Sequence, residues 1–159
     1  MRRAIALAKT VSEDAVAPNP RVGAIIVESG TVVAGGYHPF DGDPHAERVA
    51  LESLGRSPLP KAEMFVTLEP CSTAGRTGSC CERIINSRGI RRVIIGCLDP
   101  NPDHTGKALS LLRRHDMEVL WGVEQTACEA LNPRFSQRMR TLADSLRHAS
   151  TNSGGRLSH

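Results

Sequence analysis

The fold of this chain is decided by the stretch PHAE at residues 44–47, together with PCSTAGRTGSC at residues 70–80. The two stretches supply an imidazole and thiolates, which suit Zn²⁺, and three protein ligands leave a fourth tetrahedral position open for water. Zinc lowers the pKa of such a water from about 15.7 to about 7, so hydroxide is available at neutral pH. A carboxylate that does not bind the metal then moves the proton. The pattern predicts a catalytic zinc site in which Glu47 is that carboxylate, although a Glu on a helix is more often a solvated surface residue.

Two adjacent thiols, Cys80 and Cys81, compete for the last ligand position. Cys81 shares an apolar helical stripe with Ile84 and Ile85, which is typical of a free cysteine in a core. Cys80 stands at the expected start of the same helix, where the helix N-terminus favours a thiolate. We therefore predict that Cys80 is the ligand and that Cys81 is a packing residue.

The composition is that of one globular domain and excludes several classes of protein. The chain has 159 residues, of which 40% are hydrophobic and 23% are charged. A net charge of +3 is too small to indicate nucleic acid, and five aromatic residues offer few stacking surfaces for bases. Five cysteines without a secretory signal favour a reducing compartment. We expect a cytoplasmic protein with neither a nucleic-acid nor a membrane partner.

Strand patterns alternate with helix patterns along the chain, which predicts an α/β fold with a mixed sheet of roughly five strands. The Ser29-Gly30 pair predicts a hairpin that makes the first two strands antiparallel, whereas strands joined through helices should be parallel. From Ser150 the composition is that of a linker, so we expect one zinc-dependent domain over 1–149 and a flexible tail over 150–159. The expected strands are 22–27, 31–37, 64–68, 92–97 and 118–121, and the expected helices are 2–14, 45–54, 80–87, 106–115, 123–131 and one that begins at Asn132-Pro133.

The candidate site residues all fall where strands end or helices begin. His45, Cys71, Cys80 and Asp99 each occupy such a position. In open α/β sheets, ligands gather at the carboxyl ends of strands and at helix N-termini. This placement is independent of ligand chemistry, and it also predicts one shared site.

Beyond these residues, the sequence resembles the pyrimidine deaminase domain of the bifunctional riboflavin-biosynthesis deaminase/reductase, in the cytidine-deaminase-like superfamily. The resemblance covers roughly residues 2–135 and implies a three-layer α/β/α fold. The long gap between Cys71 and Cys80 follows this family, whereas cytidine, tRNA and DNA deaminases carry Cys-x-x-Cys. The matching segments are PNPRVG (18–23), GYH (36–38), GDPHAE (42–47), TLEPCS (67–72), GRT (75–77), Cys80, DPNP (99–102), LN (131–132) and Phe135.

The resemblance implies a substrate and the residues that act on it. The substrate is a diaminopyrimidinone that carries a ribosylamino 5′-phosphate, and the products are the pyrimidinedione and ammonia. His45, Cys71 and Cys80 are implied as zinc ligands, with Glu47 as the proton carrier. A homo-oligomer, either a dimer or a tetramer, is also expected, because members of the superfamily commonly form one.

Five further residues are implied as substrate contacts. Asn19 and His38 would contact the base or the ribose, and Arg76 would hold the anionic substrate. Asp99 and Asn101 would hold the ribose hydroxyls through hydrogen bonds. The alternative for Asn19, Asp99 and Asn101 is turn formation beside proline, and the alternative for His38 is a structural histidine.

The chain departs from the family pattern in ways that leave other functions open. Thr73, Ser79, His104, Arg88 and Ala108 differ from the family, and the chain stops where a reductase domain would begin, so no reductase activity is expected. One alternative is a deaminase of another aminated heterocycle in a specialised-metabolite pathway. Others are a nucleic-acid deaminase or binding module, and a non-catalytic zinc scaffold in which a substitution of Glu47 changes nothing.

Overall fold

A computed structural model describes residues 1–73 and 78–152. Its strands form one sheet in the order β2-β1-β3-β4-β5. The strands are β1 (Gly23–Glu28), β2 (Thr31–Tyr37), β3 (Ala62–Leu68), β4 (Ile90–Cys97) and β5 (Glu118–Trp121). The helices are α1 (Arg2–Ala8), α2 (Glu13–Val16), α3 (Ala46–Ser53), α4 (Cys80–Asn86), α5 (Lys107–Arg114), α6 (Gln125–Glu129) and α7 (Pro133–Asn152).

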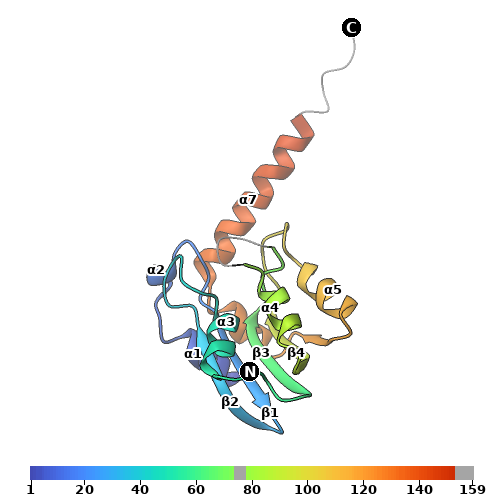
Figure 1. Ribbon diagram of the computed structural model, residues 1–159. Helices are drawn as coiled ribbons and strands as arrows, with labels where there is room; N and C mark the ends of the chain where they lie inside the picture. The colour runs from blue at the N-terminus through green and yellow to red at the C-terminus, as the bar shows by residue number, and fades with distance from the viewer. Residues whose placement is uncertain (74–77, 153–159) are drawn as a thin grey trace.

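The sheet is mixed, as the sequence predicts. β1 is antiparallel to both β2 and β3, and β4 is parallel to β3 and to β5. Figure 1 shows β1, β2 and β3 side by side. The β1–β2 turn has positive φ at both Ser29 (48°) and Gly30 (78°), which is the twist that a two-residue hairpin requires. The predicted hairpin and the mixed five-stranded sheet are therefore confirmed.

Successive side chains of a strand point to opposite faces of the sheet. Both faces carry apolar side chains, and helices cover both of them. On one face, Ala24 and Ile26 of β1 belong to the main core cluster, together with side chains from α3, α4 and α5. On the other face, Ile25 and Val27 of β1 pack with α1, and Cys128 of α6 packs near the end of β4. The result is the three-layer α/β/α arrangement that the family resemblance implies.

The N-terminal helix differs from the prediction of a single helix over 2–14. α1 ends at Ala8, and a separate one-turn helix, α2, begins at Glu13. The reason is local: Ser12 has an extended backbone, and its hydroxyl accepts a hydrogen bond from the Ala15 N–H, so it caps a new helix.

The last helix is longer than the sequence suggested. α7 runs for 20 residues to Asn152, so residues 150–152 are helical where we expected the tail to begin. Between Pro133 and Gly154 the sequence contains neither proline nor glycine, the two residues that most strongly disfavour a helix. Figure 1 shows α7 extending away from the body of the domain. None of the helices in the described ranges combines the length and the apolar character needed to cross a bilayer.

Gly36 lets α3 pack directly against β2. A Cβ added to Gly36 would lie 2.5 Å from the backbone nitrogen of Ala50 and 2.6 Å from the carbonyl oxygen of Ala46, both in α3. Backbone atoms of a helix cannot move aside singly, so a larger residue would displace the whole helix. Because α3 begins next to His45 and contains Glu47, this glycine also fixes the position of two candidate site residues.

We expect Gly36→Ala to destabilise the protein by about 3 kcal/mol, the upper part of the range for overpacked cores. Urea unfolding followed by circular dichroism measures this change. The matched control is Gly35→Ala, where the added Cβ would approach 2.9 Å from Cδ1 of Leu7, at the end of a side chain that can rotate. The control should lose clearly less stability, and equal losses would show that contact with the α3 backbone is not the cause.

Candidate active site

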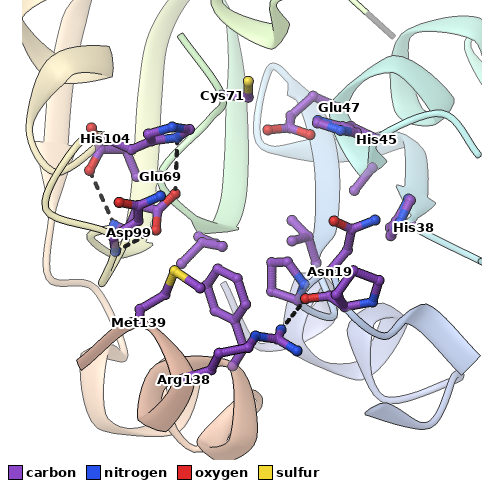
Figure 2. A pocket seen from close by; sticks show the side chains of 17 residues that line it. Asn19, His38, His45, Glu47, Glu69, Cys71, Asp99, His104, Arg138 and Met139 are labelled. Atoms are coloured by element: carbon purple, nitrogen blue, oxygen red, sulfur yellow. Dashed lines mark hydrogen bonds and ion pairs between the residues drawn. The ribbon is translucent and has the colours of Figure 1, made fainter. Parts of the chain in front are cut away.

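A pocket of about 320 Å³ opens where the carboxyl ends of β3 and β4 meet the first turn of α3. It falls within the range of volumes that bind small molecules. Figure 2 shows side chains from several separate segments pointing into it. Seven of the nine predicted ligand, catalytic and substrate residues line it, namely Asn19, His38, His45, Glu47, Cys71, Asp99 and Asn101.

The first turn of α3 positions the imidazole and the carboxylate. His45 is the N-cap residue, with an extended backbone (φ −65°, ψ 156°), and Glu47 lies in the first helical turn. Glu47 is 3% exposed, so it is not the solvated surface residue that most helical glutamates are. Ala46 and Ala50 are fully buried, and their small size allows this helix to approach the sheet closely.

The start of α4 brings the thiol to the same place. Cys80 is the first residue of the helix, and the hydroxyl of Ser79 caps it by accepting a hydrogen bond from the Glu82 N–H. The N–H of Cys81 donates to the carbonyl of Cys71 (3.2 Å), which ties α4 to the segment after β3. Cys80 is 2% exposed and therefore lies just beneath the pocket.

His45, Glu47 and Cys80 form a compact cluster of possible metal ligands. Their ligand atoms all lie within 4.8 Å of one another, and Nδ1 of His45 is 3.0 Å from Sγ of Cys80. Burial lowers the pKa of His45, which keeps its imidazole neutral and able to bind a metal. Burial, and next the charge of Glu47, raise the pKa of Cys80 above its ordinary value, while burial raises the pKa of Glu47. A divalent cation would offset the cost of burying these negative charges, so the donor set fits zinc.

The other two cysteines of this region have different surroundings. Cys71 lines the pocket, but its thiol donates to the carbonyl of Thr73 (3.1 Å), and it does not belong to the three-residue cluster. Figure 2 shows Cys71 on the pocket wall near Glu47. Cys81 is completely buried and belongs to the main core cluster with Ile84, and burial raises its pKa to about 12. As predicted, Cys81 is a packing residue.

Asn19 and His38 enter the pocket with defined polarity. Nδ2 of Asn19 donates to a carboxylate oxygen of Asp41 (2.7 Å), so the Asn19 side-chain carbonyl is left as an acceptor. Nδ1 of His38 lies 3.2 Å from the carbonyl oxygen of Pro44, which can only accept, so this nitrogen carries the proton. Nε2 of His38 is then an acceptor, and it is buried without a partner in the described part of the chain. Both side chains thus offer acceptors to a ligand.

Asp99 and Asn101 have the turn geometry that was the alternative interpretation. The Asn101 N–H donates to the Asp99 carboxylate (2.9 Å), and the Asp103 N–H donates to the Asn101 side-chain oxygen (3.0 Å). Both residues also line the pocket, so the turn and a ligand contact are compatible. Arg76, the predicted partner of an anionic substrate, lies outside the residues that the structure describes.

Glu69 has a supporting role that the sequence did not reveal. This buried carboxylate accepts hydrogen bonds from the backbone N–H groups of Asp99 (3.2 Å), Gly106 (3.0 Å) and Ala108 (3.0 Å). It therefore holds the loop after β4, including Asp99, against the end of β3. The only signal in the sequence is its place in the TLEPCS segment, because its partners lie 30 to 39 residues away in the chain.

α7 contributes a wall of the pocket that was not predicted from the sequence. Phe135, Arg138 and Met139 line the pocket from this helix, and His104 lines it from the loop after β4. Nδ1 of His104 lies 3.6 Å from the Asp99 carboxylate. Phe135, Arg138 and Met139 share one face of α7 at positions i, i+3 and i+4, but this spacing does not indicate that the face borders a cavity.

Comparisons with known proteins agree with this geometry. Residues 1–97 match the family model described as the cytidine and deoxycytidylate deaminase zinc-binding region. The chain is 45% identical over 140 residues to the riboflavin biosynthesis protein RibD of Synechocystis, and this match covers 88% of the chain and 37% of the relative. It is 41% identical over 141 residues to the diaminohydroxyphosphoribosylamino-pyrimidine deaminase of Buchnera aphidicola, covering 89% of the chain and 94% of that relative.

A solved structure gives the same result. The diaminohydroxyphosphoribosylaminopyrimidine deaminase/reductase of Thermotoga maritima superposes with a TM-score of 0.82 at 43% identity, covering 89% of the chain and 40% of that protein. The chain therefore spans well under half of its bifunctional relatives. It belongs to the family of cytidine and deoxycytidylate deaminases, and within that family to the pyrimidine deaminases of riboflavin biosynthesis.

Proposed function

We propose that the chain is a zinc-dependent hydrolytic deaminase of an aminopyrimidine, and that its substrate is the diaminopyrimidinone ribosylamino 5′-phosphate. The observation that carries this proposal is the buried cluster of His45, Glu47 and Cys80 beside a pocket of about 320 Å³. In the proposal, His45, Cys71 and Cys80 hold the metal. When bound, zinc supplies the Lewis acidity that makes hydroxide available from water near pH 7.

Glu47 moves the protons in this reaction. The carboxylate takes a proton from the attacking water, whose oxygen forms a bond to the carbon that carries the amine. The electrons of the ring C=N bond move to the ring nitrogen, which receives this proton from Glu47. Glu47 then carries the remaining hydroxyl proton to the amine nitrogen, the bond between the carbon and that nitrogen breaks, and ammonia leaves as the carbonyl forms. Burial raises the pKa of Glu47, which makes it a better base for the first transfer.

The pocket walls orient the ring and the sugar. Asn19 and His38 present acceptors, which suit the N–H groups of an aminopyrimidine. Asp99 and Asn101 lie on another part of the pocket wall and suit ribose hydroxyls. In this proposal the acceptors hold the base and Asp99 and Asn101 hold the sugar, which leaves the carbon that carries the amine facing Glu47.

Ammonia release from the diaminopyrimidinone ribosylamino 5′-phosphate by the zinc-loaded protein tests this function. We expect turnover with this compound and release of the pyrimidinedione in equal amount. dCMP is the comparison substrate, because the family model also covers deoxycytidylate deaminases. Turnover of dCMP alone would overturn the substrate assignment while keeping the reaction, and no turnover of either compound by zinc-loaded protein would overturn both.

Two expectations remain predictions beside this proposal. The protein should form a homo-oligomer, which sedimentation velocity measures directly. It should also reside in the cytoplasm, where its phosphorylated substrate would be available.

A further inference from the structure

Arg138 of α7 brings a permanent positive charge to the pocket. It is the only Lys or Arg among the described residues that line the pocket. Figure 2 shows Arg138 and Met139 on one side of the pocket and His45 and Glu47 on the opposite side, with Asn19 between them. A ligand that places its reacting carbon near Glu47 can therefore reach Arg138 with its other end.

Two contacts fix the position of the Arg138 side chain. One terminal N–H of the guanidinium donates to the carbonyl oxygen of Pro18, and the central carbon of the group lies 5.7 Å from the centre of the Phe135 ring. Pro18 and Phe135 both line the pocket themselves. A guanidinium has five N–H donors in a planar fork that matches a phosphate, and the Pro18 contact occupies one terminal nitrogen.

The carboxylates of the pocket make other positions unfavourable for an anion. The side-chain oxygens of Glu69 accept hydrogen bonds from three backbone N–H groups. Asp99 lies near His104 and accepts from the Asn101 N–H. Glu47 is the base of the proposed reaction. These side chains offer a phosphate mainly acceptor oxygens, whereas at the α7 wall the guanidinium of Arg138 offers N–H donors and a positive charge.

We propose that Arg138 binds the phosphate of the substrate and so makes the enzyme select phosphorylated over unphosphorylated aminopyrimidines. This inference rests on the proposed function, because it names the group that recognises one end of that substrate. It assigns to α7, which follows the residues that carry the zinc motifs, a direct part in specificity.

The test compares the phosphorylated substrate with the same compound after removal of its phosphate, for the wild type and Arg138→Met. A hydrogen bond to a charged group is worth enough that kcat/KM for the phosphorylated substrate should fall by about 10- to 100-fold, mainly through KM. For the dephosphorylated compound, the two proteins should differ by less than about 2-fold, since the interaction is absent. Arg138→Lys should recover part of the loss, because it keeps the charge without the fork.

Arg140→Met is the matched control on the same helix. Arg140 is exposed, does not line the pocket and contacts Gln137, so its replacement should leave both substrates unaffected. An equal effect of Arg138→Met on both substrates, or no effect on either, would overturn the proposal.

A binding measurement separates this proposal from the proposed reaction. Calorimetric titration of the zinc-loaded protein with the phosphorylated pyrimidinedione product needs no turnover. Affinity at least 10-fold weaker in Arg138→Met than in the wild type supports the phosphate contact even if no ammonia is released. Equal affinities of the two proteins for this product, or no binding by the wild type, would overturn it.

Discussion

Glu47→Gln should lower kcat for deamination by about 10⁴-fold, the upper end of what one acid–base residue contributes. The expectation is this large because one carboxylate carries both proton transfers, and the glutamine amide can perform neither. The side chain keeps its size, and the carboxylate that it replaces is 3% exposed, so the packing of α3 should hold. Steady-state ammonia release, with zinc content measured in parallel, gives the result.

Glu52→Gln provides the matched control on the same helix. Glu52 is exposed and pairs with Arg48 four residues earlier, so its replacement should leave kcat within about 2-fold of the wild type, as is usual for surface changes. If Glu47→Gln retained more than a tenth of the wild-type kcat at equal zinc content, Glu47 would not be the proton carrier. Full retention would favour a structural role for the metal.

Cys80→Ser should remove the metal. Mutation of a residue that only hydrogen-bonds a zinc ligand typically lowers metal affinity by about 10- to 100-fold. Loss of the thiolate ligand itself should therefore weaken zinc binding by more than about 100-fold. The hydroxyl of serine stays protonated near neutral pH and is a poor ligand for zinc. Chelator competition measures the affinity, and elemental analysis measures the zinc bound per chain after purification.

Cys81→Ala is the matched control for this change. Its thiol is completely buried in the core cluster that includes Ile84, so the variant should lose some stability but keep its zinc. If Cys81→Ala lost its zinc and Cys80→Ser kept it, Cys81 would be the zinc ligand and Cys80 the packing residue. Thermal unfolding of both variants with and without added zinc distinguishes lost metal from a weakened core.

The fold followed from local signals in the sequence with few exceptions. β2 and β5 have the same bounds as the strands predicted from the sequence. The β1–β2 hairpin has the positive φ values that Ser29-Gly30 indicates. The exception at the N-terminus arose because the apolar stripe of α1 continues in sequence past Ala8, whereas Ser12 starts a new helix. Periodicity reports which residues face inward, and it does not report where a cap interrupts the backbone.

The site was predicted in part, for a physical reason. His45, Glu47 and Cys80 are set by ligand chemistry and by the starts of two helices, and both features are visible in short segments. Glu69 was not recognised, because the three N–H groups that it binds lie 30 to 39 residues further along the chain. Arg138 was not recognised either, because its carbonyl partner in Pro18 is 120 residues away.

The sequence alone determined the mixed sheet, the hairpin and the residue types that suit zinc, because turn chemistry, side-chain period and ligand preference all act over a few residues. Only the tertiary structure decided how Glu69 holds the Asp99 loop and that Arg138 faces the pocket. Each of these depends on a partner that the chain brings close only when the sheet and its helices pack together.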